Sequence, residues 1–184
     1  MRDIKNEILR FWFEESRPQQ WFQVNESFDG EIRDRFLLVC EMAGDGHCSH
    51  WAADADGCLA LCLVLDQFPR NIFRGKPMAF AFDDMALQVA REAVQKGFDQ
   101  IHPSLRRRFL YLPFVHSENL ENQSRAVSLF ETMKKDDPLG YEHACRHRAL
   151  IERFGRFPGR NAVLGRKNTH EEQEYLNALE AGAY

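Results

Sequence analysis

The segment IERFGRFPGRNAVLG, from Ile151 to Gly165, intersperses arginines with phenylalanines and places an Arg-Asn pair soon after a Phe-Pro pair. The segment LDQFPRNIFRG, from Leu65 to Gly75, has the same combination. Because proline and glycine interrupt regular structure, we interpret both segments as turns at the ends of helices. We expect the rest of the chain to bring these two turns together around a polar pocket.

Apolar residues recur at helical spacing on both sides of these turns. The pattern predicts helices over residues 3–15, 29–42, 58–68, 84–96, 103–110, 118–135, 138–154 and 169–181. Helix ends are predicted at Pro18, Pro69 and Pro113, and helix caps at Asp29, Asp83, Ser117 and Thr169. No strand-like alternation competes with these periods. The sequence therefore predicts an all-α fold, a single domain over residues 1–184 in which neighbouring helices run antiparallel.

Composition excludes several classes of function. A chain of 184 residues with 44% hydrophobic residues can form one sizeable core. The net charge of −4 argues against a nucleic-acid-binding protein, and no apolar run approaches the length of a membrane span. The N-terminus is charged from its second residue, and the five cysteines are an odd number. These features favour a cytoplasmic protein with free thiols.

Polar residues of a kind that binds anions stand at the predicted helix ends. The basic residues are strongly biased to Arg, with 18 Arg and 6 Lys, and Arg contacts carboxylates and phosphates through two parallel hydrogen bonds. A helix N-terminus at Ser117 would add backbone N–H groups to such a site. The candidate ligand-binding residues are Asp66, Gln67, Arg70, Asn71, His147, Arg153, Arg156, Arg160 and Asn161.

His116 and Glu118 are the candidate catalytic residues. An imidazole near a carboxylate can act as a general acid or base close to neutral pH. Two alternatives stay open. His116 can serve only to pack against Phe114, and Asp66 and Glu118 can neutralise the arginines in a closed network that binds nothing.

Metal and cofactor motifs are missing from the sequence. His143 and His147 are one helical turn apart, but there is no Cys-x-x-Cys pair and no His-Glu-x-x-His motif. There is also no Gly-x-Gly-x-x-Gly, no phosphate-binding P-loop and no Gly-x-Ser-x-Gly elbow. We therefore predict neither a metal nor a cofactor.

Four motifs occur in a fixed order: LVLDQFPRNIFRG, AFAFDDMAL, RRRFLYLPFVHSENLENQ and RFGRFPGRNAVLGRKNT. Together they make nearly the whole chain resemble the family labelled domain of unknown function 924. The resemblance implies an all-helical, tetratricopeptide-like superhelix and no assigned reaction. It selects the candidate residues above and adds Gln123. Gly159 stands where the family phrase FPHRN would have His, so any chemistry of that His is missing here.

Three hypotheses follow for function. In the first, an Arg, His and carboxylate pocket binds an anionic small molecule and carries out acid–base chemistry. In the second, a tetratricopeptide-like groove lined by Arg binds an acidic peptide. In the third, the polar motifs only hold the fold together. The sequence names neither a reaction nor an oligomeric state.

Overall fold

The computed structural model describes residues 4–181, and no strand occurs in this range. The longer helices are α1 (Ile4–Arg10), α3 (Glu26–Gly44), α4 (Ala55–Cys62), α6 (Asp83–Gln95), α7 (Ser104–Val115), α8 (Leu120–Glu131), α9 (Pro138–Phe154) and α10 (His170–Glu180). The shorter ones are α2 (Pro18–Trp21) and α5 (Phe68–Ile72). Phe11–Glu15 and Leu63–Gln67 are π-helical, and Ser49–Ala53, Pro77–Phe80, Phe98–Ile101 and Pro158–Arg160 are 3₁₀ turns. The all-α prediction is confirmed.

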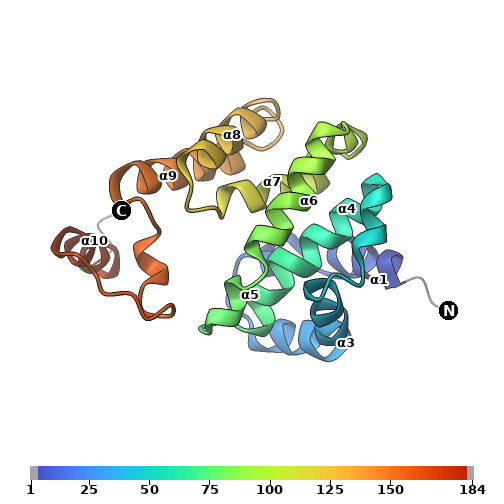
Figure 1. Cartoon of the computed structure of the whole chain (residues 1–184), viewed down its shortest axis with the longest axis horizontal. Helices are drawn as coiled ribbons and strands as arrows, with labels where there is room; N and C mark the ends of the chain where they lie inside the picture. Colours follow the sequence, from blue (N-terminus) through green and yellow to red (C-terminus); the bar gives the residue numbers. More distant parts are fainter. Residues whose placement is uncertain (1–3, 182–184) are drawn as a thin grey trace.

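The helices pack around α4, which contacts α1, α6 and α7. Helix α3 packs on α5, and α8 packs on both α7 and α9. Figure 1 shows α3 and α1 on one side of this centre, α8 and α9 along another, and α10 at the far end of the molecule. Among residues 4–181, no helix combines the length and the apolar character that crossing a membrane requires.

The core is built on one continuous buried run. Residues 57–67 are all buried, as their largely apolar sequence predicts. Aromatic rings surround this run: Trp12 packs against Phe109 at 5.6 Å and Phe36 against Phe68 at 5.0 Å between ring centroids. Burial continues through Phe68 and Pro69, so Asp66 and Gln67 are two polar groups that the helix carries into an apolar core.

The three predicted proline ends have different outcomes. The first helical segment ends at Glu15, before Pro18, and Pro18 begins α2, where a residue without an N–H leaves no hydrogen bond unmade. Pro69 does not end its helix, because residues 55–72 are helical without interruption and Pro69 lies in the first turn of α5. Pro113 lies inside α7, which extends to Val115 instead of ending near residue 110.

The predicted cap at Ser117 is wrong, and this changes the site. His116 ends α7, and α8 begins at Leu120 because the Asn119 side chain accepts hydrogen bonds from the Glu121 and Asn122 N–H groups. The first donors of α8 thus bind Asn119, so they do not serve an anion beside Ser117.

The other predicted caps have different outcomes. Asn25 caps α3 in place of Asp29, which lies in the first turn of that helix. Asp83 lies in the first turn of α6 without capping it, so its carboxylate is available to other partners. The capping box of Thr169 is confirmed.

Candidate functional site

Asp66 is the centre of a group of charged side chains. Its side chain has no exposed surface. Its Oδ1 lies 2.7 Å from His116 Nδ1 and 3.1 Å from an Arg70 terminal nitrogen, and the Gln67 amide donates to Oδ2. The segment Leu63–Gln67, helix α5 and the end of α7 therefore meet at one buried carboxylate.

The second Phe-Pro turn reaches the same place through Asp83. Arg70 donates to both Asp83 oxygens at 2.8 and 2.9 Å, and Arg160 lies 3.3 Å from one of them. Arg160 also donates to the backbone carbonyl of His116 at 2.9 Å. We call Asp66, Arg70, Asp83, His116 and Arg160 the polar cluster.

Arg160 is held between two aromatic rings. Its guanidinium carbon lies 4.6 Å from the centre of the Phe80 ring and 4.8 Å from that of Phe157. Such stacking fixes the plane of the guanidinium. Burial and then repulsion from Arg70 lower the pKa of Arg160, so attraction from the neighbouring carboxylates does not fully offset the cost of this charge. An added anion would stabilise it.

Asp66 is ionised at neutral pH, whereas His116 is neutral. Burial opposes ionisation of Asp66, but Arg70 and His116 outweigh it and bring its pKa to about 2. Burial and the charge of Arg70 lower the pKa of His116. An ionised carboxylate only accepts hydrogen bonds, so Nδ1 of a neutral His116 must carry the proton. This leaves a lone pair on Nε2, which has no hydrogen-bond partner among residues 4–181.

Two more histidines of α9 lie beside the cluster. The rings of His143 and His147 meet edge to face at 4.2 Å, and His147 packs on Phe157 at 5.1 Å. Burial lowers their pKa values to about 4 and about 3, so both are neutral at pH 7. Within the described range, no three His, Cys, Asp or Glu side chains are placed to hold a metal ion.

Glu118 lies in a neighbouring network instead of the polar cluster. It accepts two hydrogen bonds from Arg166, at 2.6 and 2.9 Å, and one from the backbone N–H of Phe157 at 2.8 Å. Arg166 also binds Asn161, which is fully buried and donates to Asn168. These contacts attach the loop after α9 to the rest of the molecule.

The remaining predicted residues are spread over other contacts. The Asn71 amide donates to Asp29, which also pairs with Arg74. Arg156 pairs with Glu172 through two hydrogen bonds. Arg153 pairs with Glu171 on the surface, where both side chains are about half exposed. The structure therefore brings Asp66, Gln67, Arg70, His116 and Arg160 together, with His147 next to them, and places Asn71, Arg153 and Arg156 elsewhere.

Sequence reasoning missed Asp83 and Arg166. Asp83 looked like a helix cap, whereas it is the carboxylate that both cluster arginines share. Its signal in the sequence was the excess of arginines over carboxylates near the Phe-Pro turns, which required a further acid.

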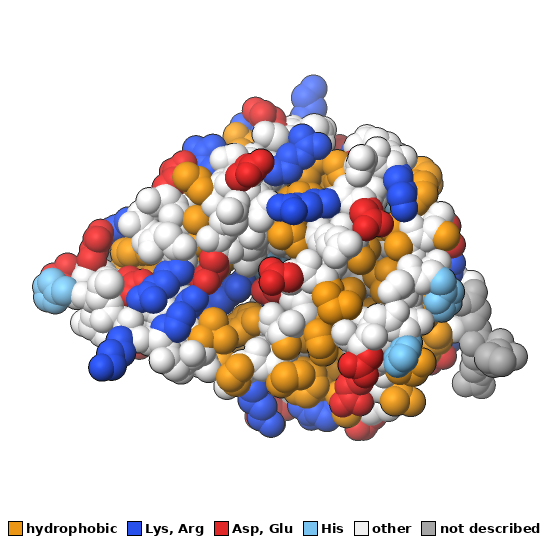
Figure 2. All heavy atoms as spheres, viewed as in Figure 1, with side chains coloured by type: hydrophobic (Ala, Val, Ile, Leu, Met, Phe, Trp, Pro, Cys, Tyr) orange, Lys and Arg blue, Asp and Glu red, His pale blue; other side chains and the backbone are white. Residues whose placement is uncertain are grey.

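Figure 2 shows basic and acidic side chains side by side where the C-terminal segment meets the rest of the chain.

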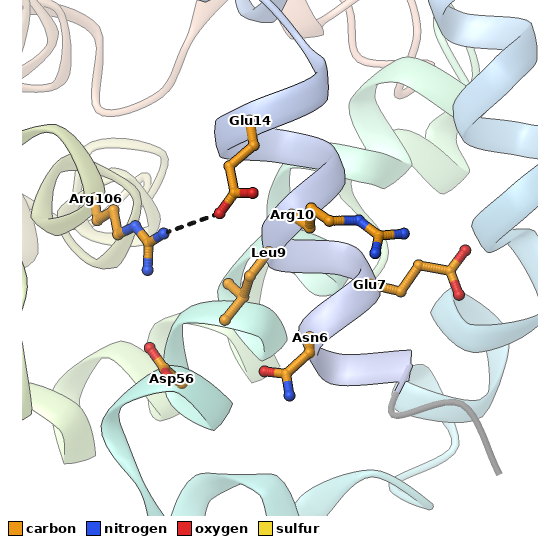
Figure 3. A pocket seen from close by; sticks show the side chains of 7 residues that line it. All are labelled: Asn6, Glu7, Leu9, Arg10, Glu14, Asp56 and Arg106. Atoms are coloured by element: carbon orange, nitrogen blue, oxygen red, sulfur yellow. Dashed lines mark ion pairs between the residues drawn. The ribbon is translucent and has the colours of Figure 1, made fainter.

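A separate hollow lies beside α1. It has a volume of about 610 Å³ and is lined by Asn6, Glu7, Leu9, Arg10, Glu14, Asp56 and Arg106. Figure 3 shows acidic and basic side chains around it, with Arg106 and Glu14 4.0 Å apart. None of the residues predicted to bind a ligand lines this hollow. Its mixed charges do not converge on one kind of ligand.

Comparison with known proteins agrees with the resemblance that the four motifs indicated. Residues 8–180 match the family model described as "Bacterial protein of unknown function (DUF924)". The chain belongs to the DUF924 family. The solved structure of the protein of unknown function ATU0120 from Agrobacterium tumefaciens is similar to this DUF924 protein, with 40% sequence identity and a TM-score of 0.89. The match covers 94% of this chain and 96% of that one. No curated protein matches.

Proposed function

We propose that this DUF924 protein binds an anionic small molecule at the polar cluster and that His116 transfers a proton there. The observation that carries the proposal is the 2.7 Å contact between His116 Nδ1 and the buried Asp66 carboxylate, with Nε2 unpartnered among residues 4–181. A carboxylate that orients an imidazole through one nitrogen leaves the other available as a base.

The arginines support an anionic ligand. Arg70 is held by two carboxylates, while Arg160 makes only one long contact to Asp83 and one to a backbone carbonyl. Arg160 is therefore the less neutralised of the two. Its exposed fraction of 15% and the 14% of His116 leave both side chains within reach of a small ligand. The ligand would take part of the interaction that Arg160 now makes with Asp83.

Glu118 receives a different role in this proposal. Both of its oxygens accept hydrogen bonds from Arg166, and one also binds the Phe157 N–H. A carboxylate whose two oxygens both accept hydrogen bonds is better suited to holding a loop in place than to transferring a proton. We assign proton transfer to His116 and the anchoring of the Arg160 turn to Glu118.

The tetratricopeptide-like superhelix with a groove for an acidic peptide stays a prediction, as does the cytoplasmic location. The cluster side chains are at most about one fifth exposed, a burial that suits a small ligand better than an extended peptide.

Thermal unfolding with added anions tests the proposal. We expect at least one of inorganic phosphate, succinate and citrate to raise the Tm of the wild type, and Arg160→Gln to abolish the increase. Arg153→Gln is the matched control because it removes the same charge from a surface pair. Sodium chloride at equal ionic strength corrects for screening. The proposal fails if no anion acts, or if the anion stabilises Arg160→Gln as much as the control.

A further inference from the structure

A second hollow, distinct from the polar cluster, is lined by residues of α7, α8 and α9 together with Phe22, which follows α2. Its volume is about 310 Å³, which is at the lower end of the range for small-molecule sites. The apolar lining consists of Phe22, Leu112, Val115, Phe130, Leu139 and Gly140. Three further residues supply polar groups: Arg108, His143 and Arg146.

Two residues of the apolar wall are exposed to water, whereas Leu112, Val115 and Phe130 are buried. Phe22 is 54% exposed and Leu139 is 72% exposed, although both border a concave surface. Exposing this much apolar area to water costs free energy, and a ligand that covers the two side chains removes that cost. The hollow therefore favours a ligand with an apolar body.

The polar groups differ in how far they are already engaged. Arg108 binds Asp137 through two hydrogen bonds and stacks on Phe22, so its charge is neutralised. Arg146 is exposed and has no carboxylate within ion-pair distance among residues 4–181. Arg146 is thus the basic side chain at this hollow that lacks an acid.

His143 supplies a second polar group without a partner. Its ring nitrogens make no hydrogen bond to any described residue, although its backbone carbonyl accepts one from His147. Burial lowers its pKa to about 4, so at pH 7 the ring is neutral and offers one donor and one acceptor. His143 and Arg146 lie three residues apart on α9 and hence on one face.

We propose that this hollow binds a free monocarboxylate with an apolar chain, with the carboxylate at Arg146 and His143 and the chain against Phe22, Leu112 and Leu139. A purely apolar ligand would leave Arg146 unused, and a small anion would leave the apolar wall exposed. The proposal does not depend on proton transfer by His116, because that side chain does not line the hollow.

Titration of the full chain with octanoate, followed by calorimetry and by methyl NMR spectra, tests this site. We expect octanoate to bind at least about tenfold more tightly than acetate, because it covers the apolar wall, and to shift the methyl signals of Leu112, Val115 and Leu139. Octanol, which has the chain without the charge, should bind about tenfold more weakly than octanoate, as expected for the loss of one charge-assisted contact.

Two surface variants should weaken octanoate binding about tenfold without unfolding the chain. Arg146→Gln removes the charge, and Leu139→Glu places a repelling charge on the exposed apolar rim. Arg148→Gln, on the same helix but outside the hollow, is the control and should bind like the wild type. His116→Asn should also bind octanoate normally, which separates this result from a failure of the proposed function. Equal binding of octanoate and acetate, or unchanged binding in either surface variant, overturns the proposal.

Discussion

In the first Phe-Pro turn, Arg70 follows thirteen consecutive buried residues, 57–69, which include a fully buried aspartate, whereas in the second turn Arg160 lies on a loop that polar contacts attach. Both arginines reach Asp83. The asparagine that follows each of them turns away: Asn71 binds Asp29, and Asn161 contacts Arg166 and Asn168. In each turn, the arginine joins the polar cluster, whereas the asparagine contacts side chains outside it.

The same combination of residues thus lies in the core in the first turn and in the loop after α9 in the second turn. Loss of a charge in the first turn should affect the whole fold, because water cannot replace the lost partner. Loss of a contact in the second turn should affect mainly the loop, because α9 and α10 do not depend on it for their own hydrogen bonds.

The largest effect is expected for Asp66→Asn. The substitution leaves Arg70 with less compensation in a buried position and removes the negative charge that orients His116. We expect the free energy of unfolding to fall by about 3 kcal/mol, measured by urea denaturation. A loss below about 1 kcal/mol would mean that the first turn is no more integral to the core than the second.

Glu118→Gln should loosen the second turn and leave the core intact. It weakens a pair of charged hydrogen bonds to Arg166 that are only about one quarter exposed. We expect the local opening free energy of residues 157–166 to fall by about 1.5 kcal/mol in hydrogen exchange. Amides of α4 serve as the internal control and should keep their protection. Equal loss of protection in both places would contradict the separation of the two regions.

The histidines of α9 predict a pH dependence. The pKa of His147 is about 3 in the folded chain and about 6.5 when unfolded, so between these values only the unfolded chain binds the proton. Stability due to this group is therefore complete above about pH 6.5 and decreases as the pH falls. The free energy of unfolding, measured by urea denaturation at several pH values, changes with pH. We expect His147→Gln to reduce the slope of this free energy against pH by about 1.4 kcal/mol per pH unit between about pH 6 and 4. An unchanged slope would show that His147 is protonated in the folded chain.

The smallest effect is expected for Arg153→Ala. Its pair with Glu171 is about half exposed and is screened by water. We expect a change of less than about 0.5 kcal/mol by urea denaturation at the same salt concentration as for Asp66→Asn. A loss of several kcal/mol in the free energy of unfolding would contradict this expectation, because it would show that Arg153 stabilises the fold strongly despite its exposure.

The helices and part of the cluster could be predicted from the sequence for physical reasons. Pro138 and the apolar period of residues 138–154 define α9, and the apolar run before Asp66 requires that carboxylate to be buried. What could not be predicted depends on tertiary geometry. Ser and Asn are both good N-cap residues, so residue type does not distinguish Ser117 from Asn119. The path of the chain after α7 determines that Asn119 caps α8.

The same limit applies to the charges. Nothing in the local sequence distinguishes Arg160, which lies between two aromatic rings, from Arg153 and Arg156, which pair with glutamates of the last helix. Asp83 could not be identified as the shared partner, because a carboxylate after an aromatic run and before a helix is also typical of a cap. The choice between partners is made by packing distances that a single sequence does not contain.

The most direct test of proton transfer at the polar cluster is the ¹⁵N NMR spectrum of the His116 imidazole in the wild type at pH 7, assigned by its loss in His116→Gln. We predict a proton on Nδ1, a free lone pair on Nε2, and a shift of the Nε2 signal when a stabilising anion is added. A doubly protonated ring at pH 7, or an Nε2 signal that no stabilising anion changes, would contradict the proposed role of His116.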